Sequence, residues 1–281
     1  PYIAAGLVGS GSERYGFDDE LSRDHDFEPG FCIFIPGEDV VSRRDAFELQ
    51  RAYDRLPSEY CGAVRQKTAP VGGRRCGVIR TADFYSAAVG APDGVLTVGE
   101  WLTLPDHALA EAVNGEVFSD AYGEFSRIRA SLEAMPRDIM LKRLAGNLLI
   151  MAQAGQYNCP RSLKRGEREA AHLAAVEFVN AAMRCVFLLS GRYMPYYKWS
   201  FRALRGLPSA GAVADKLSRI LSFDGDAVDI IESVSADIAG MVNDAKIAAF
   251  DGNELEMFAY RVNDTVSDAE IRNLHILSGV R

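Results

Sequence analysis

The chain has 281 residues, of which 48% are hydrophobic and 25% are charged, and its formal net charge is −8. This composition is typical of a globular protein with one large or two ordinary domains, and the acidic charge leaves no broad basic surface for tight, sequence-independent binding to long nucleic acids. The five cysteines are scattered and never spaced as Cys-x-x-Cys, so neither a disulfide framework nor a zinc site is expected. The sequence shows no signal segment and no apolar run of about 18 residues, which favours a cytoplasmic protein without a membrane span.

The first half of the chain alternates between short apolar runs and polar, glycine-bearing turns. Apolar runs bounded by glycine or proline are typical of buried strands, whereas apolar residues at every third or fourth position indicate a helix. The mixture of the two patterns favours an α/β or α+β arrangement. The expected strands are 2–9, 25–35, 76–81, 95–104 and a short run at 117–118, and the expected helix is 43–56.

From Pro136 onward the pattern becomes helical, because apolar residues recur every three or four positions in long segments. Pro136 suits the first turn of a helix, and Asp224-Gly225 marks a break between helices. We therefore expect an α+β protein in which a small mixed-sheet domain, residues 1–134, is followed by an all-α helical bundle domain, residues 135–281. The expected helices are 136–154, 166–190, 209–222, 225–249 and 252–260.

Asp24 and Asp26 are the candidate catalytic and metal-binding residues. They flank His25 at the start of the second apolar run, and side chains two positions apart in an extended segment share one face. Two carboxylates this close repel each other unless a cation neutralises them, and Mg²⁺ carrying substrate phosphates prefers such hard oxygen ligands. The pattern predicts a site for one or two Mg²⁺ ions. His25 is expected to be structural, because its side chain points to the other face of the strand.

The polar segment before these aspartates predicts a phosphate-binding turn. Gly11-Ser12 follows the first expected strand, and Gly16 comes four residues after Ser12. Glycine lets backbone N–H groups approach a triphosphate without obstruction, and a serine hydroxyl adds a further hydrogen-bonding group. Gly9-Ser10 also follows a hydrophobic residue and is the alternative Gly-Ser pair, although we prefer Ser12 as the serine that meets the phosphates.

Taken together, these residues resemble the active-site motif of the DNA polymerase β-type nucleotidyltransferases. That motif has a hydrophobic residue, Gly-Ser, a further glycine and, after a turn, Ser-Asp-x-Asp. This chain offers Ser22 before its pair of aspartates, with Arg23 inserted between them. The fuller string 9–31 and the segment 193–199 resemble a little-characterised bacterial branch of the same superfamily.

The resemblance implies a nucleotide site in the first domain and an acceptor site formed with the helical domain. The implied nucleotide-binding residues are Gly11, Ser12, Gly16, Ser22 and Lys198. In this superfamily a third carboxylate from a later strand often completes the metal site or acts as a base. The candidates here are Asp83, Glu100 and Asp120, and the third carboxylate can also be absent.

The predicted function is that of a magnesium-dependent nucleotidyltransferase with ATP as its donor. Such an enzyme transfers a nucleoside monophosphate to an acceptor hydroxyl and releases pyrophosphate. The acidic charge balance favours a small-molecule acceptor, such as an aminoglycoside-like compound, over tRNA or a protein. The alternative is a catalytically silent module of the same fold that binds a nucleotide or a partner protein, which the missing third carboxylate favours.

Overall fold

The computed structural model describes residues 2–20, 30–60, 62–64, 75–208, 210–223, 225–249 and 251–280. The chain divides into two compact units. The first, which we call the sheet unit, contains Pro1–Leu96 and Ala108–Ala134, and the second, which we call the helical unit, contains Thr97–His107 and Met135–Arg281. One division point lies where the sequence analysis placed its domain boundary, and residues 97–107 join the helical unit although they precede that boundary.

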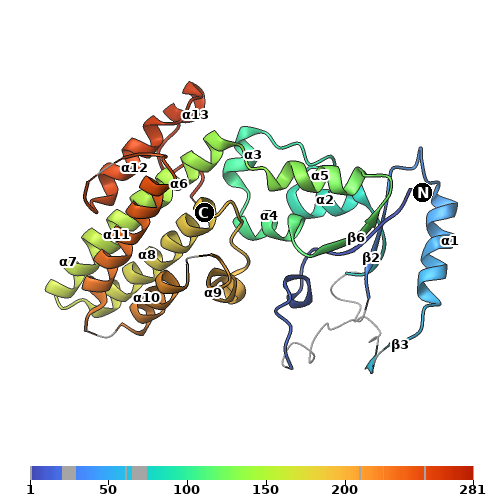
Figure 1. Cartoon of the computed structure of the whole chain (residues 1–281), viewed down its shortest axis with the longest axis horizontal. Coiled ribbons are helices and arrows are strands. Elements are labelled where there is room, and N and C mark those ends of the chain that lie inside the picture. Colours follow the sequence, from blue (N-terminus) through green and yellow to red (C-terminus); the bar gives the residue numbers. More distant parts are fainter. Residues whose placement is uncertain are drawn as a thin grey trace. The chain divides into compact units, whose positions relative to one another are not determined.

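The sheet unit is built on a four-stranded mixed sheet with the strand order β5-β2-β1-β6 (Figure 1). The central strand β1 pairs antiparallel with β2 and β6, whereas the edge strand β5 pairs parallel with β2. A separate antiparallel pair is formed by β3 and β4. The strands are β1 (Ala4–Leu7), β2 (Cys32–Ile35), β3 (Glu59–Tyr60), β4 (Ala63–Val64), β5 (Gly77–Arg80) and β6 (Glu116–Asp120).

Helices pack on both faces of this sheet because the side chains of β2 alternate between two apolar layers. Ile33 and Ile35 belong to a buried cluster with residues of α1 on one face. On the other face Phe34 stacks on Phe125 of α5 with ring centroids 4.0 Å apart, and its ring lies 5.2 Å from that of Phe84 of α2. The helices are α1 (Arg43–Asp54), α2 (Thr81–Val89) and α5 (Glu124–Glu133).

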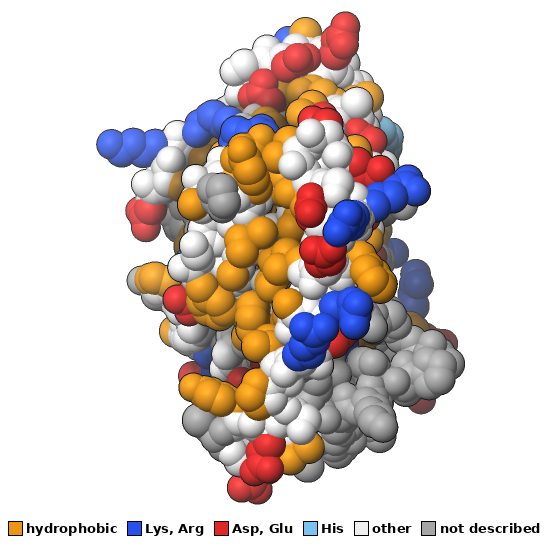
Figure 2. All heavy atoms as spheres, turned by 90° about the vertical axis from the view of Figure 1, so that its right-hand side faces the viewer, with side chains coloured by type: hydrophobic (Ala, Val, Ile, Leu, Met, Phe, Trp, Pro, Cys, Tyr) orange, Lys and Arg blue, Asp and Glu red, His pale blue; other side chains and the backbone are white. Residues whose placement is uncertain are grey.

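The β6 side of the sheet is covered less completely than the β2 side. All four residues of β2 are buried, whereas β6 is half-buried or exposed along its length. Figure 2 shows hydrophobic side chains gathered across one face of the molecule. Exposed large side chains near β6 include Phe118, and Tyr2 and Tyr122, whose rings meet edge to face at 5.5 Å.

The helical unit has α6 and α8 as its central helices, and α6 packs against both α8 and α12 (Figure 1). Lys142 of α6 is fully buried, and its ammonium group donates to Asn263 Oδ1 at 2.8 Å and to the Leu274 carbonyl at 2.7 Å. These bonds fasten the last part of the chain to α6. The helices are α3 (Val98–Thr103), α4 (Asp106–Val113, which continues into the sheet unit), α6 (Arg137–Met151), the π-helix η3 (Ala152–Asn158), α7 (Cys159–Lys164), α8 (Arg168–Leu189), α9 (Tyr197–Arg205), α10 (Gly211–Ser222), α11 (Ala227–Asp244), α12 (Leu255–Asp264) and α13 (Ala269–Asn273).

Helix α8 is long and apolar enough, by length and composition, to cross a membrane. Glu177 and Arg184 interrupt its apolar residues, which is why the sequence shows no continuous apolar run of that length. In the structure α8 is a core helix, because side chains such as Phe178 and Val186 are fully buried against neighbouring helices. Such burial accounts for its hydropathy without a membrane.

The prediction of a strand at 95–104 is wrong, because residues 98–103 form helix α3. The cause is a capping box: the Thr97 hydroxyl accepts from the Glu100 N–H at 3.3 Å, and the Glu100 carboxylate accepts from the Thr97 N–H at 2.7 Å. The helix expected at 136–154 continues through η3 and α7 to Lys164. Helices α2, α4 and α5 were not predicted, because they are short and their apolar patterns are weak. Helix α9 is amphipathic but only nine residues long, and it was not predicted either.

Candidate functional site

The expected phosphate turn lies at one end of the sheet, where three other connections also arrive. β1 leads into the Gly-Ser turn, residues 8–16, at this end. β2 and β6 begin at the same end because they are antiparallel to β1, and β5 begins there because it is parallel to β2. The segments directly before these three strands are 30–31, 75–76 and 114–115. We call this edge the turn end of the sheet.

Arg14 holds the Gly-Ser turn in place. It lies in the single 3-10 turn η1 (Ser12–Tyr15) and is only 3% exposed. Its guanidinium group donates to the carbonyls of Val8 at 2.7 Å, Ser10 at 2.7 Å and Arg75 at 3.0 Å, donates to the sulfur of Cys76 at 3.5 Å, and forms an ion pair with Glu13. These bonds use all the donors of the guanidinium group, so Arg14 joins the turn to the start of β5 and is not available as a ligand-binding cation.

Asn114 holds the turn from the other side. Its side-chain amide donates to the Gly9 carbonyl at 2.7 Å and accepts from the Gly9 N–H at 2.8 Å. Gly9 has a φ of 102°, a conformation that favours glycine. Gly115 has a φ of 69°, and a Cβ there would lie 1.9 Å from the Leu7 carbonyl oxygen. The Asn-Gly pair therefore starts β6 and fixes the turn at the same time.

Cys32, the first residue of β2, has a thiol of unusual acidity beneath the turn. A hydrogen bond from Cys76 and the positive charge of Arg14 lower the pKa of Cys32 to about 7, against the opposing effect of burial. Its sulfur also lies 3.2 Å from the Arg75 carbonyl oxygen. The side chains beneath the turn thus favour negative charge at Cys32, where Arg14 is the nearby cation.

Tyr15 closes the turn on the side of α4. Burial raises the pKa of Tyr15 well above its usual value, and the Glu111 carboxylate raises it further. The ring stacks on that of Phe17 with centroids 5.8 Å apart. Tyr15 therefore stays neutral at physiological pH and serves as packing for the turn.

Glu13 is a carboxylate at the turn that the sequence analysis did not single out. Gly11 has a φ of 133°, and a Cβ there would lie 2.5 Å from both carboxylate oxygens of Glu13. Because Glu13 is paired with Arg14, its negative charge is neutralised in this position. Of the two serines that flank Gly11, Ser10 is exposed and Ser12 is half-buried. Both serines of the two alternative Gly-Ser pairs are therefore accessible.

The structure places some of the predicted site residues and leaves others outside its description. Gly11 and Ser12 lie at the turn end, and Gly16 ends η1 with a φ of 66°. Ser22, Asp24 and Asp26 lie within 21–29, outside the described residues. The described chain resumes at Gly30, directly before β2 and therefore at the turn end.

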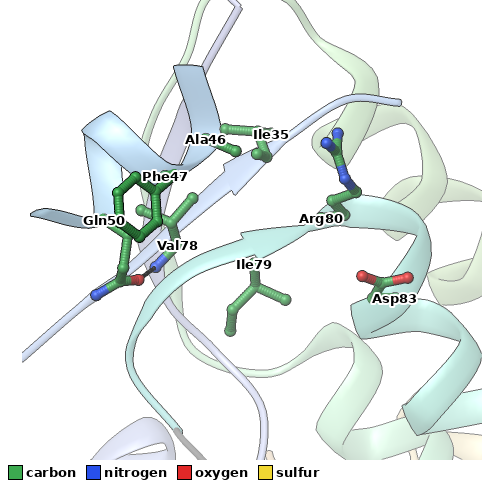
Figure 3. Close-up of a pocket in the computed structure, with 8 residues that line it drawn as sticks. All are labelled: Ile35, Ala46, Phe47, Gln50, Val78, Ile79, Arg80 and Asp83. Atoms are coloured by element: carbon green, nitrogen blue, oxygen red, sulfur yellow. Dashed lines mark hydrogen bonds between the residues drawn. The ribbon is translucent and has the colours of Figure 1, made fainter. Parts of the chain in front are cut away.

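Asp83, the first candidate for a third carboxylate, lies at the end of the sheet opposite the turn. It belongs to the first turn of α2, which begins where β5 ends. Figure 3 shows it at a pocket of about 420 Å³ that Arg80 and Phe47 also line. Two polar groups at this pocket are engaged within the unit: Gln50 accepts from the Val78 N–H at 2.9 Å, and Arg80 donates to the Pro36 carbonyl at 2.7 Å. This position makes Asp83 unsuitable as a partner for the turn.

The other two candidates cap helices. Asp120 ends β6, also at the far end of the sheet, and its carboxylate accepts from the N–H groups of Gly123 at 2.7 Å and Ser126 at 2.8 Å. Glu100 completes the capping box of α3, and hydrogen bonds from Thr97 lower its pKa. Both carboxylates are explained by local structure, so none of the three candidates has a position that marks it as a metal ligand.

The segment 193–199 leads from α8 into α9. Tyr197 begins α9, and the exposed Lys198 has its ammonium group 5.7 Å from the centroid of the Trp199 ring. The Tyr196 ring lies 4.5 Å from that of Tyr197 and meets His107 edge to face at 5.7 Å. These ring contacts join Tyr196 to Tyr197 and His107, although both tyrosines are exposed. Lys198 remains a predicted nucleotide-binding residue of the helical unit.

Sequence reasoning missed two residues that shape the turn. Asn114 has no role in the sequence analysis, because nothing in the sequence pairs it with Gly9, 105 positions away. Arg14 lies in a polar segment where an exposed charge is the usual expectation. Within the described ranges, no three side chains of His, Cys, Asp or Glu are grouped closely enough to hold a metal ion.

Comparison with known proteins gives one match. Residues 101–200 match a protein family described as a domain of unknown function, DUF4037. No curated protein and no solved structure matches the chain. The matched segment covers just over a third of the chain, from α3 to α9, and includes the Tyr193–Trp199 segment but not the Gly-Ser turn.

Proposed function

We propose that this protein is a magnesium-dependent nucleotidyltransferase that transfers a nucleoside monophosphate from ATP to a hydroxyl group of a small-molecule acceptor. The observation that carries the proposal is the turn end of the sheet. A turn with glycines at positive φ is held there from both sides by Arg14 and Asn114, and the described chain resumes at the same end at Gly30, four residues after Asp26 in the sequence.

The rigidity of the described turn supports the proposal that it binds the phosphates of a nucleotide. A turn that is fixed by buried hydrogen bonds keeps its N–H groups in one geometry, which lowers the entropy that binding would otherwise cost. Ser10 and Ser12 offer accessible hydroxyls beside Gly11. Arg14 contributes by positioning the turn, since its own donors are used within the protein.

Asp24 and Asp26 would hold the metal, and Ser22 would stand at the start of the same Ser-x-Asp-x-Asp string. When bound, Mg²⁺ supplies the charge that neutralises the triphosphate and lowers the pKa of the acceptor hydroxyl. The protein positions that oxygen in line with the α-phosphorus, so that the new P–O bond forms as pyrophosphate leaves. Lys198, in the segment 193–199 that carries part of the resemblance, stays a predicted nucleotide-binding residue.

Replacement of either aspartate tests the proposal. We expect Asp24→Asn and Asp26→Asn to lose at least about 1,000-fold in turnover of radiolabelled ATP while the thermal unfolding temperature changes little, because the metal ligands act on the reaction and not on the core. Asp18→Asn, which changes an exposed carboxylate of the same segment, is the matched control and should retain its turnover. Equal turnover in all three variants would reject the assignment.

A second candidate function is a catalytically silent module that binds a nucleotide or a partner protein. It is favoured by the positions of Asp83 and Asp120, which leave the turn end without either as a third carboxylate. A silent module would bind ATP or its partner without pyrophosphate release and without any effect of Asp24→Asn on binding. Pyrophosphate release by the unmodified protein would exclude it.

A further inference from the structure

A cluster of buried charged side chains lies within the helical unit, on residues that the proposed nucleotide site does not use. Asp106 begins α4 and is 7% exposed, and Arg143 of α6 is 1% exposed. Arg143 Nη2 lies 2.7 Å from one carboxylate oxygen of Asp106, and Nε of Arg184, in α8, lies 3.5 Å from the other. One carboxylate therefore bridges two guanidinium groups.

The charges of this cluster do not balance. Arginine stays protonated in proteins, so two guanidinium groups facing one carboxylate leave a net positive charge. His107 and Cys185 are neighbouring titratable groups: a protonated His107 adds to the positive charge around Asp106, and burial raises the pKa of Cys185, so that this thiol stays neutral. A buried charge without a counter-charge is unfavourable, and folded proteins pair such groups or bind an ion.

The cluster also lacks hydrogen-bond partners. Five buried side-chain atoms have no hydrogen-bond partner within the described part of the chain, and two of them are donors of this cluster, Arg143 Nη1 and Arg184 Nε. A third is the amide oxygen of Asn147 on α6, an acceptor that an anion would not satisfy. Asn147 lies one turn after Arg143 and donates to its carbonyl at 2.8 Å. Arg143 Nη1 has no partner in this cluster, and Arg184 Nε has only the ion pair with Asp106 at 3.5 Å. Both nitrogens are cationic donors, so the missing partner is an acceptor with negative charge. A water molecule would satisfy the donors but would not balance the charge.

We propose that Arg143 and Arg184 form a binding site for a small oxyanion, a phosphate or a carboxylate group of a ligand. Guanidinium groups match the oxygen geometry of both anions. Asp106 positions the two arginines by bridging them and leaves Nη1 of Arg143 for the ligand. The Arg184 side chain is 23% exposed, whereas its Nε and Arg143 Nη1 are buried, so an anion reaches them only if the Arg184 side chain moves. This site does not depend on nucleotidyl transfer.

Thermal unfolding and calorimetry with inorganic phosphate and with succinate test the site and distinguish the two kinds of anion. Sodium chloride at equal ionic strength sets the baseline. We expect phosphate or succinate to raise the unfolding temperature above that baseline. Arg184→Gln should weaken the binding by about tenfold or more, the usual effect of losing a charge-assisted hydrogen bond. The control Arg192→Gln, an exposed arginine just after α8, should bind within about twofold of the unmodified protein.

Asp106→Asn separates a binding site from a purely structural ion pair. Removal of the internal carboxylate leaves both arginines without their counter-charge, so the variant should be less stable and should gain more from added oxyanion than the unmodified protein does. The proposal is overturned if neither anion binds the unmodified protein, or if Arg184→Gln binds as well as the parent. It is also overturned if Asp106→Asn loses stability that phosphate and succinate do not restore.

Discussion

The two units each bury an arginine beside a carboxylate, and the two arginines differ in how completely they are bonded. Arg14 in the sheet unit is 3% exposed and donates to three carbonyls, a sulfur and Glu13. Arg143 in the helical unit is 1% exposed and pairs with Asp106 through Nη2, while its Nη1 has no partner within the described residues. A fully bonded arginine supports the backbone around it, whereas an incompletely bonded one is free to recognise a ligand.

The same difference separates the two proposed sites. At the turn end, the buried polar groups hold the loop in one conformation. The ligand is expected to bind to the backbone and the serines of that loop. In the helical unit, the buried guanidinium groups themselves would meet the ligand. Variants that remove the hydrogen bonds of each arginine test whether the two arginines differ in this way.

Replacement of the buried Arg14 should lower the stability of the protein more than replacement of an exposed arginine does. Arg14→Met leaves the carbonyls of Val8, Ser10 and Arg75 without their donor and Glu13 without its counter-charge, which should lower the free energy of unfolding by about 3–5 kcal/mol. Urea unfolding followed by circular dichroism measures this loss.

Arg43→Met is the matched control for that experiment. Arg43 forms an ion pair with Glu38 at 2.8 Å, but its side chain is 84% exposed, so its loss should cost less than about 1 kcal/mol. If the two variants unfold with similar free energies, Arg14 does not hold the turn as described.

The pKa of Cys32 gives a second test of the role of Arg14, because the positive charge of Arg14 is one of the causes that lower this pKa. The pKa of Cys32 is about 7 in the folded chain against a usual value of 9.0. A thiol whose pKa is lower in the folded chain than in the unfolded chain stabilises the fold. This stabilisation is complete above the pKa of the unfolded chain and is lost as the pH falls through the pKa of the folded chain. The free energy of unfolding should therefore rise by about 2 kcal/mol from pH 7 to pH 9 through this group. Urea unfolding of the parent and of Cys32→Ser at both pH values measures it, and Cys32→Ser/Cys76→Ser is a second comparison because the two thiols are hydrogen-bonded to each other. A pH dependence that is identical in the parent and in Cys32→Ser would contradict the account.

The sequence was informative where a pattern is local. The apolar runs around Ala4–Leu7 and Gly77–Arg80 predicted strands, and the periodic segments from residue 136 onward predicted helices, because alternation and helical spacing are set by neighbouring residues. The prediction of a strand at 95–104 was wrong because Val95 and Trp101 are residue types that favour strands. The capping box of Thr97 and Glu100 outweighs that preference.

The bonds that shape both sites could not be predicted in the same way. Asn114 reaches Gly9 across 105 positions, and Asp106 meets Arg143 across 37. Nothing in a single sequence marks which polar side chain turns inward, since charged residues are exposed by default. The Gly-Ser turn was located from its glycines, but the residues that hold it became visible only in the fold.

Binding of magnesium-loaded ATP, measured by calorimetry, tests the central claim most directly. We predict that the unmodified protein binds ATP with magnesium and binds it at least about tenfold more weakly when EDTA removes the metal, because the two aspartates hold the nucleotide through the cation. Asp24→Asn and Asp26→Asn should lose this metal dependence. ATP binding that is equal with and without magnesium, or that both variants retain in full, would contradict the account.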